Sequence, residues 1–282
     1  MKILIIGSQG FIGKHCVDYF SKYHQVTAQG VTQDFGSLFV AQKYDVCINA
    51  SGSANVGFSF ENPAIDFELN VLNVNKLLVA IRQHNPTCKF INFSSAAVYG
   101  NPMKLPIAEN TPTKPLSPYG FHKLQSEYLL TEYHKFFGLH TCSLRVFSAY
   151  GNGLKKQLFW DLYQKTLQND KIELFGTGEE SRDFIFIDDL IQTVAIIIEN
   201  APFEGDIFNI ASGNETKIKE VVKVFFDEFC PQKSYYFSGK QKIGDPNNWC
   251  ADISKIKELG FKSQITIQLG LEKYAKWLKE NK

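Results

Sequence analysis

The N-terminal stretch constrains the fold of this chain most. An apolar run at residues 3–6 leads directly into Gly7-Ser8-Gln9-Gly10-Phe11-Ile12-Gly13, and a helical pattern follows to about residue 23. A continuous apolar strand is typical of the interior of a parallel sheet. Glycines at such a junction let the backbone turn tightly and approach a pyrophosphate, which accepts hydrogen bonds from N–H groups at the start of the helix. The spacing predicts a dinucleotide site, with a simple tight turn as the alternative.

Strand-like and helix-like segments go on alternating along the chain. Apolar strand-like runs recur at residues 26–29, 45–50, 89–93 and 141–147. A helical pattern over about residues 60–84 carries apolar side chains at steps of three or four, and another helix is expected up to residue 137. Such alternation predicts an α/β fold with a Rossmann-type, doubly wound parallel sheet and right-handed crossovers.

After about residue 150 the expected elements become shorter. Helices are expected at residues 158–168, 190–199, 218–229 and 268–279, and strands at 172–175, 183–187 and 207–210. We therefore expect residues 1–150 to form the dinucleotide-binding domain. Residues 151–282 should form a smaller α/β substrate-binding region that is interleaved with the first.

Composition excludes several classes of partner. The formal net charge is +1, so no field for nucleic acid is expected. No run of 18 uncharged apolar residues predicts a membrane span. The six cysteines lack a Cys-x-x-Cys pair, and the six histidines show no ligand spacing, so no metal site is expected. Buried thiols and an N-terminus that forms a strand instead of a signal peptide favour a reducing cytoplasm.

The segment Ser117-Pro118-Tyr119-Gly120-Phe121-His122-Lys123 carries the first candidate for chemistry. Proline suits the first turn of a helix, and serine can cap it. Tyr119 and Lys123 are four residues apart and so share one helix face. A phenol with a reference pKa of about 10 is a poor proton carrier near neutrality, and a neighbouring ammonium should lower that pKa. Alone, this spacing also occurs by chance on amphipathic helices.

Polar residues at strand ends complete the candidate site, because ligands of doubly wound sheets bind beyond the carboxyl ends of the strands. Ser95 follows the strand at residues 89–93, where its hydroxyl can donate to a substrate oxygen; an ordinary turn serine is the alternative. Asn49 and Ala50 end the third strand, and we assign both to the cofactor site. From its position Asp34 suits capping of the next helix, whereas the family resemblance given below implies a place in the cofactor site beside the adenine.

Five motifs stand in order along the chain: the glycine loop, Ser94-Ser95-Ala96-Ala97-Val98-Tyr99-Gly100, Ser117 to Lys123, Leu144-Arg145-Val146-Phe147-Ser148-Ala149-Tyr150-Gly151, and Arg182-Asp183-Phe184-Ile185-Phe186-Ile187-Asp188-Asp189. Together they resemble the extended short-chain dehydrogenase/reductase family. More narrowly, they are similar to its nucleotide-sugar epimerase, dehydratase and ketoreductase branch. Gly244-Asp245-Pro246 continues the resemblance, which spans nearly the whole chain.

The resemblance implies a role for each motif. Ser95, Tyr119 and Lys123 would be catalytic, with Asn70 in support. The dinucleotide would contact Tyr119, Lys123 and the glycine loop through Gly7, Gln9, Gly10, Phe11, Ile12 and Gly13. Arg182 would clamp the diphosphate of a nucleotide-sugar, since a guanidinium presents a fork of donors. Ser148 and Lys242 would also bind substrate, Lys242 standing where the family has a second arginine.

Two departures from the family pattern narrow the expectation. The dehydratases carry Thr-Asp-Glu where this chain has Ser95-Ala96-Ala97, and two alanines cannot move the protons of a dehydration. The second strand ends in Gln29-Gly30 without the carboxylate that accepts from the ribose 2′-hydroxyl of NAD. Its absence favours NADP(H), although no arginine follows to hold a 2′-phosphate, and NAD(H) is the alternative.

The function expected from these features is reduction of the C4 keto group of an NDP-4-keto-6-deoxysugar by an NAD(P)H-dependent ketoreductase. The alternative is an NAD-dependent nucleotide-sugar 4-epimerase that uses the same residues, and a third possibility is a catalytically idle dinucleotide-binding protein. The resemblance also implies a homodimer, in which the helices ending near His84 and Phe137 pair with their copies. Leu129, Tyr133, Phe136 and Phe137 suit such an interface and equally suit packing within one chain.

Overall fold

The protein is described by a computed structural model that covers residues 1–31, 34–240, 244 and 246–281. Its main sheet has six parallel strands in the order β2-β1-β3-β4-β5-β9. They are β1 (Lys2–Ile6), β2 (Gln25–Gln29), β3 (Val46–Asn49), β4 (Lys89–Ser95), β5 (Thr141–Val146) and β9 (Glu204–Ile210). The predicted doubly wound parallel sheet is confirmed.

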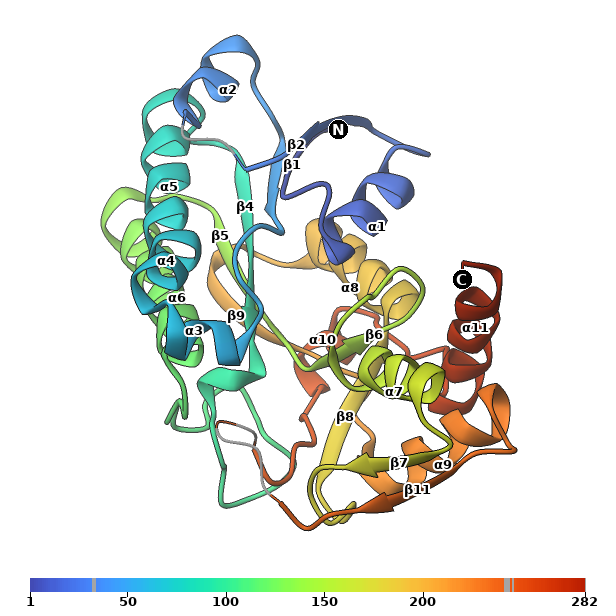
Figure 1. Cartoon of the computed structure of the whole chain (residues 1–282). Coiled ribbons are helices and arrows are strands. Elements are labelled where there is room, and N and C mark those ends of the chain that lie inside the picture. Colours follow the sequence, from blue (N-terminus) through green and yellow to red (C-terminus); the bar gives the residue numbers. More distant parts are fainter. Residues whose placement is uncertain (32–33, 241–243, 245, 282) are drawn as a thin grey trace.

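Helices cover both faces of this sheet (Figure 1). One face carries α1 (Phe11–Phe20) and α8 (Ile187–Asn200). The other carries α2 (Gly36–Ala41), α3 (Val56–Glu61), α4 (Pro63–Phe67), α5 (Asn73–His84) and α6 (Pro118–Phe137). Successive side chains of a strand point to opposite faces of the sheet, so each face has its own hydrophobic core. Ile3 and Ile5 pack in one core, while Leu4 and Ile6 pack in the other.

The helix expected over residues 60–84 is interrupted in the structure. α3 ends at Glu61, and α4 begins at Pro63, whose missing N–H suits the first turn of a new helix. A turn of π-helix, η1 (Glu68–Leu72), then leads into α5. Periodicity alone does not reveal these breaks, because the apolar steps continue through them. Single π-turns inside helices are frequent at functional sites.

A smaller lobe follows β5. Its strands are β6 (Ser148–Tyr150), β7 (Lys171–Leu174), β8 (Ser181–Phe186), β10 (Glu215–Lys217) and β11 (Ser234–Phe237), and its helices are α7 (Gln157–Gln168), α9 (Ile218–Phe229), α10 (Ser254–Glu258) and α11 (Ile267–Glu280). The strands form two small sheets, β10-β8-β6 and β11-β7. In Figure 1 the arrow of β4 points towards this lobe, so the carboxyl edge of the main sheet faces it.

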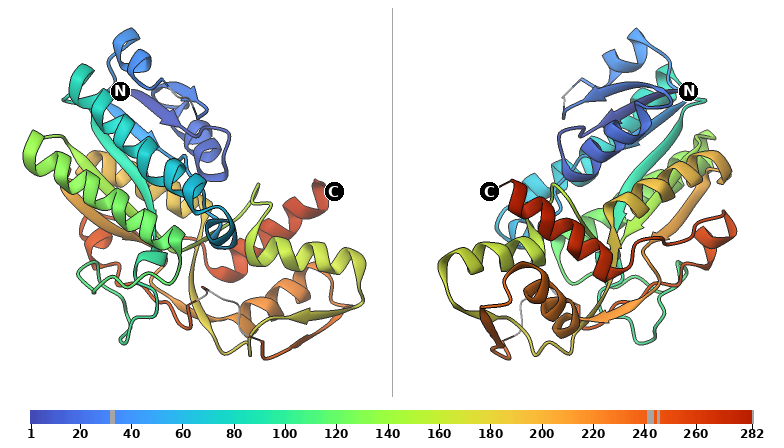
Figure 2. Two further views of the ribbon diagram at one scale, coloured as in Figure 1. Left: turned by 60° about the vertical axis from the view of Figure 1, so that its left-hand side comes forward. Right: turned by 90° about the vertical axis from the view of Figure 1, so that its right-hand side faces the viewer.

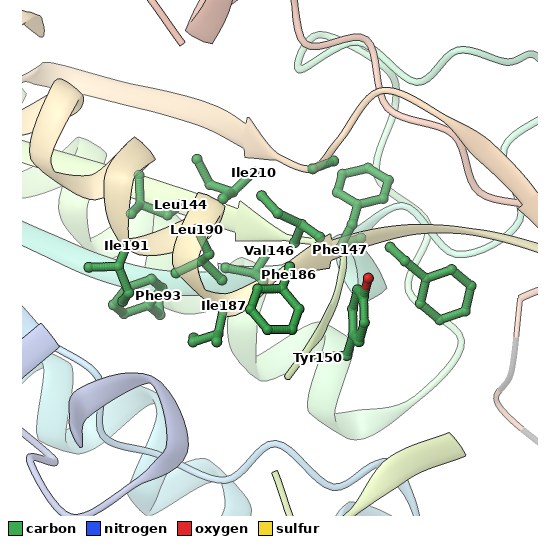
Figure 3. Packing of buried hydrophobic residues seen from close by; sticks show 14 of the residues in the cluster. Phe93, Leu144, Val146, Phe147, Tyr150, Phe186, Ile187, Leu190, Ile191 and Ile210 are labelled. Carbon is green, nitrogen blue, oxygen red and sulfur yellow. The ribbon is translucent and has the colours of Figure 1, made fainter. Parts of the chain in front are cut away.

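The later half of the chain also completes the main sheet. β9 pairs in parallel with β5, and α8 packs against α1. Figure 3 shows Ile210 of β9 close to Leu144 and Val146 of β5, with Leu190 and Ile191 of α8 beside them. Figure 2 shows the main sheet and the helices that cover it from two other sides. The division at residue 150 stays a prediction, while the interleaving of the two halves is visible in these contacts.

Candidate active site

The carboxyl ends of β1 and β3 meet at the point where the strand order reverses, which is where doubly wound sheets bind ligands. Gly7 has φ 77°, and a Cβ there would lie 2.6 Å from the backbone nitrogen of Ser51. A Cβ on Gly13 would lie 2.1 Å from the carbonyl oxygen of Gly7. Only glycine fits either position, so the backbone turns tightly and α1 packs close to β1. These residues fit a dinucleotide pyrophosphate at the start of α1.

The rest of the glycine loop is arranged around that helix start. Gly10 is the N-cap residue of α1, and Gln9 is exposed in the turn before it. Phe11 and Ile12 are half-buried in the first turn. The N–H groups of this turn therefore have no capping side chain in front of them.

The predicted residues at the ends of β2 and β3 have clear structural roles. Asn49 Nδ2 donates to Asn92 Oδ1 at 2.8 Å, and Asn49 Oδ1 accepts from Ser51 Oγ at 2.5 Å, which holds the loop after β3. The Ala50 nitrogen donates to the carbonyl oxygen of Ile6 at 2.9 Å. Asp34 Oδ1 accepts from the backbone nitrogen of Ser37 at 3.1 Å and its other oxygen accepts from the Ser37 hydroxyl. Asp34 thus holds the first turn of α2, whose N-cap residue is Phe35, and its place beside the adenine stays a prediction.

Tyr119 and Lys123 lie on the first two turns of α6. Ser117 Oγ accepts from the Gly120 nitrogen at 3.2 Å and caps the helix, as predicted, with Pro118 in the first turn. Ser95, at the end of β4, lies close enough to the Tyr119 hydroxyl for its side chain to lower the pKa of Tyr119. Lys123 Nζ donates to the carbonyl oxygen of Phe93 at 2.9 Å and lies 5.9 Å from the centroid of the Tyr119 ring. The fold therefore brings the three predicted catalytic residues together.

Burial sets the proton affinities of this group. It raises the pKa of Tyr119 to about 12, while the Ser95 side chain lowers it and the Asp66 carboxylate raises it further. The expected lowering of this pKa is therefore wrong for the protein alone, because burial of the phenol is the largest effect. Burial also lowers the pKa of Lys123 to about 8, against the opposite effects of Asp66 and Glu127 and together with repulsion from Lys156.

Asn70 faces Lys123 across Gly52. A Cβ on Gly52, which has φ 115°, would lie 2.5 Å from Asn70 Oδ1 and 3.5 Å from Lys123 Nζ. Asn70 is 1% exposed, and neither atom of its side-chain amide has a hydrogen-bond partner among the described residues. A buried amide without partners is costly and rare in a folded protein. The π-turn of η1 thus places beside Gly52 and Lys123 a buried donor and acceptor that suit a ligand.

The substrate-side residues come from the smaller lobe. Ser148 is half-buried on β6 beside Phe184 of β8. Arg182 on β8 donates from Nη1 to the carbonyl oxygens of Ser181 at 2.8 Å and Asn247 at 3.2 Å. Its guanidinium carbon lies 5.7 Å from the centroid of Trp249, whose indole N–H donates to the Gly100 carbonyl oxygen. Through Trp249, Arg182 is linked to Gly100 in the segment that follows Ser95. Lys242 lies outside the described residues.

Sequence reasoning missed two charged groups near the catalytic residues. Asp66 is fully buried on α4 and contacts His122 of α6, with Asp66 Oδ2 at 2.6 Å from His122 Nδ1. Lys156, just before α7, is close enough to lower the pKa of Lys123. His122 lies inside a motif that was recognised, but its partner is 56 positions away. No local pattern pairs residues at that separation.

Comparison with known proteins gives a consistent picture. The chain is 29% identical to the UDP-glucose 4-epimerase of Corynebacterium glutamicum over 94% of this chain and 92% of that protein. It is 27% identical to the UDP-glucuronate 4-epimerase of Thermodesulfobacterium geofontis, over 92% and 80%. A solved structure of UDP-glucuronic acid 4-epimerase from Bacillus cereus, in complex with UDP-glucuronic acid and NAD, superimposes with a TM-score of 0.90 over 99% of both chains at 26% identity.

A family model agrees with these relatives. Residues 3–211 match the model described as the NAD dependent epimerase/dehydratase family. The match includes the glycine loop, Ser95, the Tyr119 helix and Arg182, and it confirms the resemblance to the extended short-chain dehydrogenase/reductase nucleotide-sugar branch. With this match, the chain belongs to the NAD dependent epimerase/dehydratase family of enzymes.

Proposed function

We propose that this protein is an NAD-dependent 4-epimerase of a UDP-sugar. The observation that carries the proposal is the cluster of Ser95, Tyr119 and Lys123, in a chain that matches several 4-epimerases over most of their length. These relatives favour the 4-epimerase over the ketoreductase that the sequence led us to expect. The glycine loop and Asn70 fit a bound dinucleotide, as argued above.

NAD is the cofactor that this proposal requires. The Bacillus cereus relative holds NAD, and NADP(H), which the sequence favoured, receives no support from that structure. One feature of this chain agrees with NAD, because the loop after β2 offers no described arginine for a 2′-phosphate.

The geometry suggests what each residue does in the reaction. Bound NAD supplies a hydride acceptor that also serves as the donor when the hydride returns. Tyr119 takes the proton of the sugar 4-hydroxyl as C4 loses its hydride, and Ser95 donates a hydrogen bond to the same oxygen. After the keto sugar rotates, Tyr119 returns the proton to that oxygen while the hydride reaches the other face of C4. No net oxidation results.

Lys123 supplies the positive charge that this proton transfer needs. Burial makes the Tyr119 phenolate unfavourable, so a nearby cation has to stabilise it. The Lys123 ammonium is anchored to the Phe93 carbonyl oxygen and stands beside the Tyr119 ring. Asn70, which faces Lys123 with two unpartnered polar atoms, is placed to hydrogen-bond a ligand in the same crevice.

The reaction product distinguishes the epimerase from the ketoreductase. We would incubate the protein and NAD with UDP-glucose, UDP-glucuronate or UDP-N-acetylglucosamine, and separate the 4-epimers by chromatography. The proposal expects a 4-epimer at equilibrium without accumulation of NADH, and no product from Tyr119→Phe. Stoichiometric oxidation of NADPH by an NDP-4-keto-6-deoxysugar, without epimerisation of any UDP-sugar, would establish the ketoreductase instead.

We also propose a homodimer through α5 and α6. The outward side of α6 exposes Phe121 (53%), Tyr128 (61%) and Phe136 (68%), whereas Tyr133 is buried and donates to Asn75 Oδ1 at 3.1 Å. Exposed aromatic side chains along one helix suit an interface between copies. Light scattering at micromolar concentration should give twice the mass of 32.0 kDa, and a monomer would refute the proposal.

A further inference from the structure

Next to the catalytic residues, α4 and α6 are joined by a buried pair of titratable side chains. His122 Nδ1 donates to Asp66 Oδ2 at 2.6 Å, and the edge of the His122 ring packs on Phe67 with centroids 5.4 Å apart. Asp66 is 0% exposed, and His122 is 12% exposed. The second carboxylate oxygen, Asp66 Oδ1, has no hydrogen-bond partner among the described residues. The pair is therefore held by a hydrogen bond and by ring packing, and Asp66 Oδ1 remains without a partner among the described residues.

The position of the pair connects it to proton transfer. His122 lies between Tyr119 and Lys123 in the sequence of α6, and the Asp66 carboxylate raises the pKa of both. The other charged groups on the elements that pack against α6 differ from Asp66 in burial, pairing or sign. Glu61 of α3 is exposed and Glu68 of η1 is half-buried. Glu127 is paired with Arg145, and Lys156 lowers the pKa of Lys123. Of the described carboxylates, Asp66 alone acts on both residues.

We infer that His122 and Asp66 form a positioning pair that holds the Asp66 carboxylate beside Tyr119 and Lys123. The His122 ring hydrogen-bonds to Asp66 Oδ2 and so fixes the carboxylate against α6. The charge of this carboxylate then acts on the two residues. The inference rests on the proposed function only in taking Tyr119 and Lys123 as the proton-transfer residues.

The sign of the effect follows from electrostatics. A negative charge favours protonated Tyr119 and protonated Lys123, so its removal lowers the pKa of both. Both limbs of a bell-shaped pH profile should then move to lower pH. Loss of a neighbouring charge typically shifts such a pKa by about one unit or more, so each limb should move by about one pH unit.

The experiment compares Asp66→Asn with His122→Asn by the pH dependence of kcat. Asp66→Asn keeps a group that can bond to His122 but removes the charge, and we expect both limbs to move down by about one pH unit. His122→Asn keeps an N–H donor near the Nδ1 position and leaves the Asp66 charge in place. We expect both of its limbs to stay at the wild-type position. If both variants lower kcat or thermal stability without moving either limb, the pair has only a packing role.

A second readout does not depend on the reaction. In protein labelled with 13C at tyrosine Cζ, the Tyr119 signal can be assigned from its absence in Tyr119→Phe. The inference expects this signal to titrate at lower pH in Asp66→Asn than in the wild type or in His122→Asn. Equal titration in all three proteins would overturn it. If no UDP-sugar is epimerised, the proposed function fails, whereas this titration still tests the pair. If Asp66→Asn does not fold, Asp66→Ser, which also removes the charge, takes its place in the comparison.

Discussion

Two buried polar clusters lie on the same helix, α6, and they differ in how many of their polar atoms have hydrogen-bond partners. In the first, Glu127 accepts from Arg145 Nη2 at 2.7 Å and from Ser94 Oγ at 2.5 Å, and Arg145 also donates to the Tyr99 hydroxyl at 2.8 Å. In the second, one turn nearer the start of the helix, Lys123 faces Asn70. There the amide of Asn70 and one oxygen of Asp66 have no partner among the described residues.

This difference indicates what each cluster is for. A buried ion pair whose hydrogen bonds are satisfied joins elements of the fold, here α6 to β4 and β5. Buried polar atoms without partners reduce stability, so their presence points to ligand binding or catalysis. The comparison predicts that replacements in the first cluster reduce stability and that replacements in the second reduce activity.

Tyr119→Phe should have the largest effect. The variant keeps the ring in its buried place but loses the hydroxyl that carries the proton, so kcat should fall by about 100- to 10,000-fold. Its free energy of unfolding should change by no more than about 1 kcal/mol. Steady-state kinetics and urea unfolding of the same preparation check both statements. Near wild-type turnover would remove Tyr119 from the mechanism.

Glu127→Gln should reduce stability by about 3–5 kcal/mol, because it leaves the Arg145 guanidinium buried without its counter-charge. Urea unfolding measures the loss. The double variant Glu127→Met, Arg145→Met is the matched control, since a buried pair replaced by apolar residues of similar volume is often neutral. An unchanged stability in the single variant would show that this cluster is not the structural one.

Lys123→Met should make the protein more stable and inactive. Burial lowers the pKa of Lys123 from 10.5 to about 8, so the unfolded chain holds this proton more tightly than the folded one. The ammonium therefore costs stability at neutral pH, and its removal should add about 1–3 kcal/mol after the lost bond to Phe93 is counted.

The pH dependence checks the cause of this gain. The cost of the wild-type ammonium is fully present below pH 8 and fades as the pH rises from about 8 towards 10.5, where both states are neutral. Unfolding of Lys123→Met and wild type across this range should therefore converge. A gain that is constant with pH would mean that packing of the methionine, not the charge, is responsible.

Asn70→Leu should change stability least, by about 1 kcal/mol or less in either direction. Leucine has a similar volume, and the two polar atoms that it removes have no described partners to lose. Turnover or NAD affinity should nevertheless fall. The control is Asn75→Leu in α5, the helix that follows η1, because this variant loses the hydrogen bond from Tyr133. Equal effects of the two variants on activity would contradict a role for Asn70 in the site.

Much of the fold and part of the site follow from local sequence pattern. Continuous apolar runs specify buried parallel strands, glycines specify the turn after β1, and Ser117-Pro118 specifies the start of α6. Tyr119 and Lys123 share a face because of helical spacing, which is also local. These features depend on neighbours within a few residues, so the amino-acid order suffices to predict them.

Other features depend on contacts between distant segments, and only the tertiary structure decides them. The bonds of Asp34 to Ser37 are seen only in the fold, while its place beside the adenine stays a prediction. The sequence placed the pKa of Tyr119 too low, because the spacing of residues does not reveal the depth of burial. Three further features arise when α4, α6 and the later half of the chain pack together: the pairing of Asp66 with His122, the Asn70 amide without a partner among the described residues, and the entry of β9 into the main sheet. Local pattern determined the elements and the pairing of Tyr119 with Lys123 on one helix face, whereas packing determined the electrostatics, because burial and charge proximity are properties of the assembled chain.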